Sequence, residues 1–312
     1  MKEITIMIPT FNEEENIIPI YCEIVKMFKD KLWGYRYKIL FIDNKSTDST
    51  RLLIRNLCND DKNVCAILNA RNAGFLNSTY YGLINTTSDC TIMLFADFQD
   101  PIELIPRMVQ EWEKGFEVVC CVKNKSYENK LLYAARSIYY RLIKAMSDVN
   151  HIEHFTGFGL YDKHFIKIMR ELEDPTPFLR GIVAELATNY TIIEYQQNKR
   201  RAGKSKFSLY KLYDVAMVAF TSYTKVGLRI ATFFGFFMSI AGLLVSLLYL
   251  ILKLCLWDMF PGGAIPVLIG VFGLGSVQLF FIGLLGEYVL SINARLMKRP
   301  LVIEEKRINF DI

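Results

Sequence analysis

Three groups of polar residues follow short apolar stretches in the first third of this 312-residue chain. They are IMIPTFNEEENI at 6–17, FIDNKSTDST at 41–50 and MLFADFQDP at 93–101. Short apolar stretches bounded by turn-forming residues and separated by helical patterns are typical of βαβ units. Because such sheets bind ligands at the carboxyl ends of their strands, we expect the three groups to lie at a common site.

The third group could bind a metal ion through Asp97 and Gln99, which are separated by one residue. Alternate residues of an extended chain point the same way, so both side-chain oxygens would face one cation. Mg²⁺ and Mn²⁺ prefer oxygen ligands and often bridge to diphosphate oxygens. Asp100 is either a general base or the cap of a helix that begins at Pro101.

The second group places Asp43 at the end of an apolar strand. Its carboxylate could accept the imide N–H of a uracil, or it could only stabilise the turn that follows. Ser46, Thr47 and Asp48 are typical of such a turn and of a helix cap. In the first group, glutamates follow Asn12, and an acidic first turn is common because of the helix dipole alone.

The fold that these patterns predict is α/β with a mostly parallel sheet. A helix is expected near 14–29, and another after the turn at 44–50. The expected strands are residues 4–8, 37–42, 64–68, 91–95 and 117–122.

The C-terminal third differs in composition from the rest of a chain that is 52% hydrophobic. Segments 230–256 and 264–292 carry one charge each, Lys253 and Glu287. Each exceeds the roughly 20 residues that a membrane-spanning helix requires. We expect a two-helix transmembrane hairpin; the alternative is a buried helical hairpin of a soluble protein.

The charges that flank this hairpin predict its orientation. Basic residues precede the first segment and follow the second, whereas the short connection between them carries only Asp258. By the positive-inside rule, both termini and the N-terminal domain lie in the cytoplasm, at the inner (plasma) membrane.

Four regions follow along the chain. We expect a cytoplasmic domain at 1–206 and a membrane hairpin at 230–292. Residues 207–229 would be an amphipathic juxtamembrane helix or an ordinary core helix. Residues 293–312 would be a cytoplasmic tail.

Charge and cysteine content narrow the classes of partner. A net charge of +5 is too small and dispersed to indicate nucleic-acid binding. Local basic clusters near 199–206 and 295–299 fit anionic phosphates or membrane lipids better. Seven cysteines without a CxxC pair indicate reduced thiols.

The order of the three groups resembles family 2 of the nucleotide-sugar glycosyltransferases, which have the GT-A fold. The resemblance is closer to the polyprenyl-phosphate branch, which includes dolichyl-phosphate mannose synthases and bacterial undecaprenyl-phosphate glucosyltransferases. Further matching motifs, in chain order, are ARNAGF at 70–75, FLRG at 178–181, RRAGKSKF at 200–207 and GEY at 286–288.

The resemblance implies roles for individual residues. A nucleotide sugar, most simply a UDP-sugar, would be bound by Pro9, Thr10, Phe11, Glu13, Asp43, Asn72, Asp97, Arg200, Ser205 and Lys206. The catalytic residues would be Asp97, Asp100, Arg200 and Lys206, with Mg²⁺ or Mn²⁺ on Asp97 and Gln99. Lys123 and Arg136 would bind the acceptor phosphate. The basic loop at 200–207 could equally contact lipid headgroups.

The chain departs from the family pattern at two acidic positions. Phe95 and Gly157 stand where the family usually has aspartates, the second of them a proposed catalytic base. A phosphomonoester has its second pKa near 6 and is mostly a dianion at pH 7. Such an acceptor needs no proton abstraction, so the missing aspartate favours a phosphate over a sugar hydroxyl.

We therefore expect inverting transfer of a hexose to a polyprenyl (undecaprenyl) phosphate at the cytoplasmic membrane face, for cell-surface glycan or O-antigen modification. The resemblance also implies a homo-oligomer, a tetramer. The alternatives are a non-lipid glycan acceptor, a processive synthase, and a catalytically weak membrane scaffold. A processive synthase would carry a QxxRW motif, and Trp33, Trp112 and Trp257 do not form one.

Overall fold

The computed structural model describes residues 1–125, 152–198, 264–297 and 299–310, with scattered positions between 217 and 255. Arg136, Arg200, Ser205 and Lys206 lie outside the described residues, as does the proposed juxtamembrane helix apart from Met217.

Eight strands of the described chain form one sheet in the order β7-β5-β6-β4-β1-β2-β3-β8. Their bounds are β1 Glu3–Thr10, β2 Arg36–Asp43, β3 Val64–Asn69, β4 Cys90–Met93, β5 Val118–Lys125, β6 Phe155–Asp162, β7 Tyr190–Gln196 and β8 Glu304–Ile308. The strands β4, β1, β2 and β3 are mutually parallel, whereas β6 and β8 pair with their neighbours in antiparallel fashion. The predicted α/β architecture is confirmed: four parallel strands form the centre of the sheet, and β5 and β7 at one edge are also parallel to each other.

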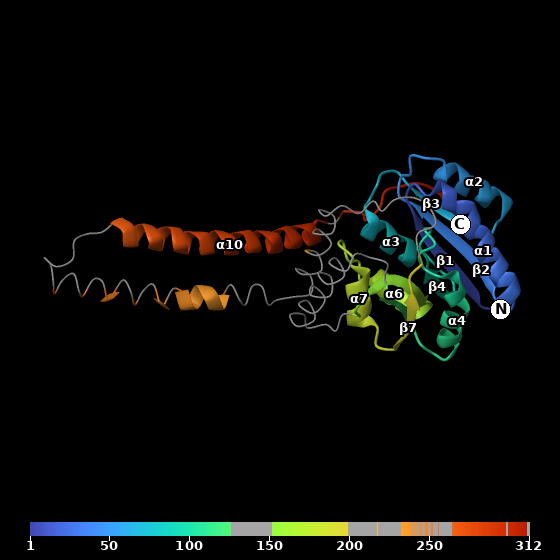
Figure 1. Cartoon of the computed structure of the whole chain (residues 1–312). Coiled ribbons are helices and arrows are strands. Elements are labelled where there is room, and N and C mark those ends of the chain that lie inside the picture. Colours follow the sequence, from blue (N-terminus) through green and yellow to red (C-terminus); the bar gives the residue numbers. More distant parts are fainter. Residues whose placement is uncertain are drawn as a thin grey trace.

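Helices cover both faces of this sheet (Figure 1). One face packs against α1 (Glu14–Lys31), α2 (Thr50–Asp60) and α4 (Ile105–Glu113), the last preceded by a 3₁₀ turn at Ile102–Leu104. The other face packs against α3 (Phe75–Ile84), α6 (Lys163–Glu171) and α7 (Leu179–Leu186). Because both faces are covered, the central strands are apolar along most of their length, as parallel strands require.

The five strands expected from the sequence are all present, with ends that differ by a few residues. The largest difference that matters for the site is in β4, which ends at Met93 instead of Phe95. The chain turns at Ala96 and Asp97, and Phe98 has a φ of 58°. This left-handed conformation is incompatible with an extended strand.

The parallel pairing sets the position of the site. Thr10, at the end of β1, lies opposite Asp43, at the end of β2. Asp43 in turn lies opposite Leu68 of β3, one residue before that strand ends. The strand β4 is also parallel to β1, with Met93 opposite Met7, so the three polar groups at 6–17, 41–50 and 93–101 leave the sheet at one edge, as the sequence predicted.

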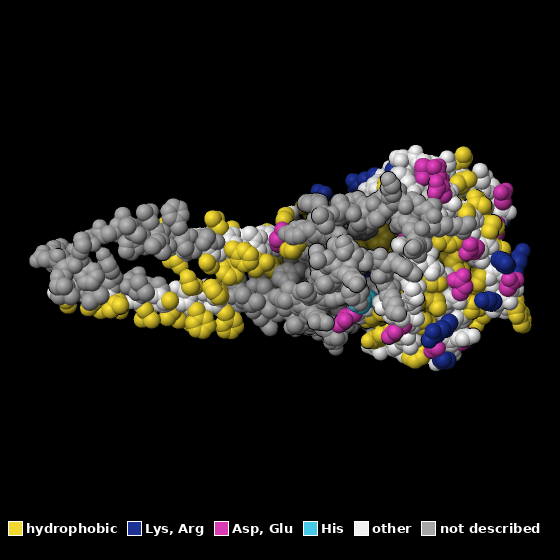
Figure 2. Space-filling view, viewed as in Figure 1, with side chains coloured by type: hydrophobic (Ala, Val, Ile, Leu, Met, Phe, Trp, Pro, Cys, Tyr) yellow, Lys and Arg dark blue, Asp and Glu magenta, His cyan; other side chains and the backbone are white. Residues whose placement is uncertain are grey.

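A long helix, α10 (Ala264–Leu296), projects away from this domain (Figure 1). Large apolar side chains are exposed along it, including Val267, Leu279, Phe280 and Leu290 (Figure 2). Among the residues that the structure describes, no helix is both long enough and apolar enough to cross a bilayer. Much of 230–256 lies outside those residues, so the membrane hairpin stays a prediction.

The segment expected to be a C-terminal tail contributes the edge strand β8. It pairs antiparallel with β3, and the carbonyl of Ile303 accepts a hydrogen bond from the backbone N–H of Ala70 at 2.8 Å. The Asn309 amide also donates to the Val64 carbonyl at 2.8 Å. This strand, which no pattern in the sequence indicated, returns the chain to the N-terminal domain after α10.

Candidate functional site

The loops that follow β1 and β2 are joined by hydrogen bonds. The backbone N–H of Asn12 donates to the Ser46 hydroxyl at 2.8 Å, and the Asn12 side-chain carbonyl accepts from the backbone N–H of Thr47 at 2.8 Å. The backbone N–H of Glu13 donates to the Thr50 hydroxyl at 2.8 Å. Asn12 has a φ of 55°, a conformation that asparagine tolerates better than most residues. The two loops therefore form one unit.

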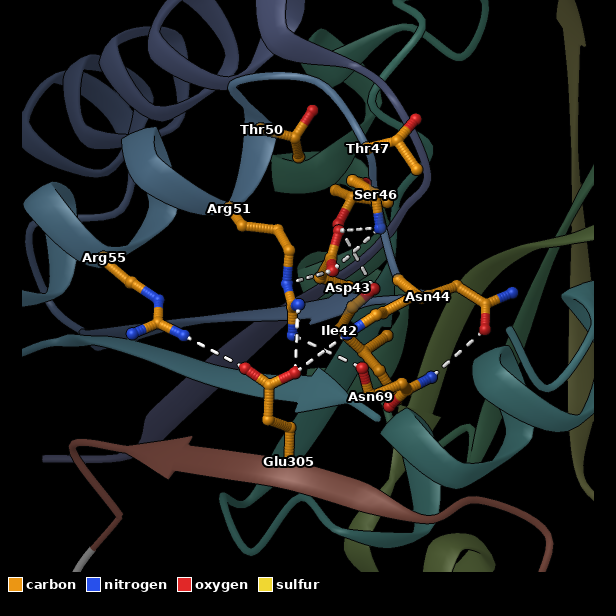
Figure 3. A network of polar contacts seen from close by, with 12 residues as sticks. Ile42, Asp43, Asn44, Ser46, Thr47, Thr50, Arg51, Arg55, Asn69 and Glu305 are labelled. Atoms are coloured by element: carbon orange, nitrogen blue, oxygen red, sulfur yellow. Dashed lines mark hydrogen bonds and ion pairs between the residues drawn. The ribbon is translucent and has the colours of Figure 1, made fainter. Parts of the chain in front are cut away.

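Asp43 lies beneath this unit, and its side chain is fully buried. Its carboxylate accepts the backbone N–H of Ser46 at 3.1 Å and forms an ion pair with Nε of Arg51 at 3.0 Å (Figure 3). Burial raises the pKa of Asp43, while Ser46 and Arg51 act in the opposite direction. In this arrangement the carboxylate stabilises the turn, which was one of the two roles considered from the sequence. A contact with a nucleobase stays a prediction.

Asn44, which the sequence analysis passed over, joins a third loop to the first two. Its side-chain amide donates to Asn72 at 3.0 Å, and its carbonyl accepts from the backbone N–H of Ala73 at 2.8 Å and from Asn69 at 3.2 Å. The predicted ligand Asn72 is thus brought to the loop after β2. A run of asparagines at strand ends was the available signal, since asparagine is common in turns.

The other predicted residues of the nucleoside pocket lie at the same edge. Pro9 and Thr10 end β1, and the Thr10 hydroxyl donates to the Ile42 carbonyl at 3.2 Å. Phe11 is half-buried in the loop that follows. Glu13 precedes α1, and its carboxylate accepts from the Asn16 amide at 2.8 Å.

The predicted metal ligands Asp97 and Gln99 lie in a turn rather than in an extended chain. One carboxylate oxygen of Asp97 accepts the backbone N–H of Gln99 at 3.1 Å across the left-handed Phe98. The argument from strand alternation was therefore wrong, because local hydrogen bonding replaces the extended geometry on which it depended. Asp97 is 9% exposed, so the group lies just beneath the surface.

The chemistry of this donor set fits a hard divalent cation that completes its shell with substrate. Within the described residues, no three His, Cys, Asp or Glu side chains gather as a metal site. Mg²⁺ is commonly held by one or two carboxylates together with substrate phosphates and water. Asp97 and Gln99 would supply two oxygens of that kind, and the diphosphate would supply others.

Asp100 is buried and does not cap the helix that follows. Its carboxylate accepts a hydrogen bond from the hydroxyl of Tyr195 on β7. Burial raises the pKa of Asp100 to about 6, although nearby Lys123 and the Tyr195 hydroxyl both lower it. The carbonyl of neighbouring Gln99 accepts from the backbone N–H of Asn198 at 2.9 Å. The loop that carries Asp97 is thus fixed to the end of β7.

The two positions that depart from the family pattern have structural explanations. Phe95 is packed against Phe75 of α3, with ring centroids 5.8 Å apart. Gly157 has a φ of 105°, and a Cβ there would lie 2.5 Å from the Met93 methyl group. Gly159 is equally constrained, since its Cβ would lie 2.3 Å from the Val119 carbonyl oxygen. The backbone of β6 therefore requires glycine at both positions.

A model of one protein family and several curated proteins match this sequence. The model described as glycosyl transferase family 2 matches residues 5–169. A bactoprenol glucosyl transferase of Shigella phage SfX is 31% identical over 98% of this chain and 99% of that protein. A prophage bactoprenol glucosyl transferase homologue of Escherichia coli K12 is 30% identical, over 96% of this chain and 97% of that protein.

The solved structures that resemble this chain are less similar to it in sequence than these curated proteins. Staphylococcus aureus TarS 1–349, in complex with UDP-GlcNAc, superposes with a TM-score of 0.48 at 15% identity. The superposition covers 71% of this chain and 66% of that one.

We predict that restoring the missing acid, Gly157→Asp, destabilises the protein by about 1–3 kcal/mol and does not raise turnover. A non-glycine residue at this φ is strained, and its Cβ would displace Met93. Chemical denaturation and a transfer assay measure the two effects. Gly34→Asp is the control, because a Cβ at Gly34 meets no atom within 4 Å. Higher turnover without loss of stability would contradict this explanation of Gly157.

We also predict that Tyr195→Phe destabilises the protein by about 1.5–3 kcal/mol at pH 8, because the ionised Asp100 loses a buried hydrogen bond. The cost should be smaller at pH 5, where a carboxyl with a pKa of about 6 is mostly protonated and the lost bond is a weaker neutral one. Without Tyr195 the folded-state pKa of Asp100 rises further, so stability falls more steeply as pH increases.

Denaturation at both pH values tests this pattern against Tyr35→Phe. The Tyr35 hydroxyl donates to Glu113 at 3.0 Å near the surface, and the pKa of Glu113 is lowered, so it does not titrate in this range. A pH-independent cost for Tyr195→Phe would show that Asp100 does not change its protonation state in the folded protein between pH 5 and pH 8.

Proposed function

Because this chain belongs to glycosyl transferase family 2, we propose that it transfers a hexose, most simply glucose, from a UDP-sugar to a polyprenyl phosphate. The observation that carries the proposal is the similarity to bactoprenol glucosyl transferases along nearly the whole length of both chains. The family match alone covers only residues 5–169. The likeness of the C-terminal part to these relatives therefore supports a lipid-linked acceptor.

In the proposed reaction, a phosphate oxygen of the acceptor attacks the anomeric carbon of the sugar. The bond between that carbon and the diphosphate oxygen breaks, and the nucleotide diphosphate leaves with the bonding electrons. One displacement inverts the anomeric configuration. The acceptor is already a dianion at neutral pH, so no proton has to be removed. A glycine at position 157 is compatible with such an acceptor.

The chain's own residues then have two tasks, which are alignment of the donor and neutralisation of the leaving group. Asp97 and Gln99 would hold Mg²⁺ or Mn²⁺, which neutralises charge on the diphosphate. The loop unit of Asn12 and Ser46 would position the nucleoside. Arg200, Ser205 and Lys206 are proposed to close over the phosphates, and Lys123 and Arg136 to attract the acceptor phosphate.

Asp100 is better suited to position the Asp97 loop than to accept a proton. It is 2% exposed, and its carboxylate is bound by Tyr195. A general base needs a direct or single-water path to the proton that it removes. The role as catalytic base, considered from the sequence, is therefore the less favoured of its roles.

We further propose that 230–256 and 264–292 form a membrane hairpin at the inner membrane, with the catalytic domain in the cytoplasm. Support comes from the flanking basic residues and from the exposed apolar side chains along α10. A membrane-bound site suits an acceptor that is itself a lipid. Self-association as a tetramer, which the resemblance implies, belongs to the same proposal; glycines such as Gly275 and Gly283 of α10 would permit close packing between helices.

The central test is transfer by the full-length protein in detergent, supplied with radiolabelled UDP- and GDP-sugars, Mn²⁺ and undecaprenyl phosphate. We expect a labelled lipid with UDP-glucose and loss of at least about 100-fold in turnover for Asp97→Ala, which removes charge stabilisation of the leaving group. The control is Asp30→Ala, a change of the same type on the exposed surface of α1.

Other results would favour the alternatives. Labelling of a soluble glycan but not of the lipid would identify a non-lipid acceptor. Absence of transfer, together with no Mn²⁺-dependent UDP binding by calorimetry, would favour the scaffold. An anomer-resolved product spectrum that shows retention would exclude the single displacement.

Topology can be tested with a membrane-impermeant maleimide on intact cells. In a variant without other cysteines, Cys22 on exposed α1 should react only after permeabilisation. A single cysteine introduced as Asp258→Cys should react in intact cells, because the hairpin places it outside. Equal reactivity of both sites before permeabilisation would rule out the proposed orientation.

A further inference from the structure

The carboxylate of Glu305, on the C-terminal strand β8, lies among three basic side chains of the β2–α2 region, two of which, Arg51 and Arg55, are labelled in Figure 3. It contacts Lys45 at 3.1 Å, Arg51 at 3.1 Å and Arg55 at 3.3 Å. These contacts join residues about 250 positions apart in the sequence. The pKa of Glu305 is lowered by its hydrogen bonds with Lys45 and Arg51, so it is ionised at neutral pH.

Arg51 is the residue through which this contact reaches the candidate site. Its guanidinium has three partners at once: Asp43 at Nε, Glu305 at Nη1 and the Asn69 carbonyl at Nη2. The distances are 3.0, 3.1 and 3.3 Å. The contacts with Glu305 and the Asn69 carbonyl are hydrogen bonds that fix the plane of the guanidinium, whereas the contact with Asp43 is an ion pair without hydrogen-bond geometry. A flexible lysine could not reproduce this arrangement.

Asp43 carries the effect of this orientation to the nucleoside loops. It accepts the backbone N–H of Ser46, and the Ser46 hydroxyl accepts the backbone N–H of Asn12. A continuous series of polar contacts therefore runs from β8 through Arg51 and Asp43 to the loop after β1. Each contact in it is between described residues at 3.1 Å or less.

We propose that β8 is part of the donor site, and that Glu305 is a positioning residue that orients Arg51 against Asp43 and so sets the affinity for the nucleotide diphosphate. This inference rests on the proposed function. It also gives α10 a link to the donor site, since α10 ends at Leu296 and β8 begins at Glu304. The segment between them is secured by the hydrogen bond from Ala70 to Ile303.

A role in stability alone does not account for this arrangement. The Glu305 side chain is 37% exposed, and exposed ion pairs contribute little to folding. Arg51 is only 15% exposed and Asp43 is fully buried, so reorienting Arg51 would affect a desolvated carboxylate. We therefore expect the loss of Glu305 to affect the conformation of the nucleoside loops more than the stability of the fold.

Glu305→Gln and Glu304→Gln form a matched pair for the test. Glu304 is the preceding residue on the same strand, but it pairs with Arg307 at 2.7 Å, away from Arg51. For the full-length protein in detergent with Mn²⁺, we expect Glu305→Gln to raise the Kd for UDP about fivefold. An effect of this size is typical of mutations in a coupled network whose residues do not touch the ligand. The KM for UDP-glucose should rise in parallel, with kcat changed less than about twofold. Glu304→Gln should leave both constants unchanged.

Arg51→Lys keeps the charge but removes the planar fork, so it should raise the Kd at least as much, whereas Glu305→Asp should restore part of the affinity. Thermal unfolding of each variant separates affinity from stability. The inference is overturned if Glu305→Gln binds UDP like Glu304→Gln, or if its loss of affinity comes with a fall in melting temperature that Glu304→Gln does not share. Failure of the wild-type protein to bind any nucleotide would instead reject the proposed function.

Discussion

The burial of Asp43 is the constraint on which this edge of the sheet depends. An ionised carboxylate without water is costly unless charge and hydrogen bonds compensate it. The Ser46 N–H and the Arg51 guanidinium provide that compensation, and both must be held in place. The turn after β2, the first turn of α2 and the edge strand β8 are therefore arranged around one side chain. The position of the loop after β1 depends on the same side chain, because Asn12 is hydrogen-bonded to the turn after β2.

The sequence was sufficient for features that depend on neighbouring residues. Apolar stretches with short turns between them predicted β1 to β5, and the polar residues after Ile8, Ile42 and Met93 indicated the edge at which the site lies. Local backbone conformation was harder to predict from the sequence. The left-handed Phe98 is a bulky residue that rarely adopts such a φ, so nothing in FADFQDP indicated the turn that separates Asp97 from Gln99.

Features that depend on contacts between residues far apart in the chain could not be predicted from the sequence. The strand β8 reads EEKRI, a polar segment typical of an edge strand or of an exposed tail. Its partners Lys45, Arg51 and Leu68 lie more than 200 residues earlier in the chain. No motif in the sequence singles out Arg51, and only the fold shows that it is mostly buried between two carboxylates. Tyr195 and Asp100 are a second such pair.

The absence of an acid at position 157 then has a physical meaning beyond a lost motif. The backbone there takes a conformation suited to glycine, so position 157 carries no side chain that could remove a proton. Asp100 lies in the same loop as Asp97, and its carboxylate is occupied by Tyr195. A site with these properties can stabilise a leaving group and align two substrates. It is poorly equipped to activate a neutral hydroxyl, so an acceptor that is ionised before it arrives is the chemistry that the described residues favour.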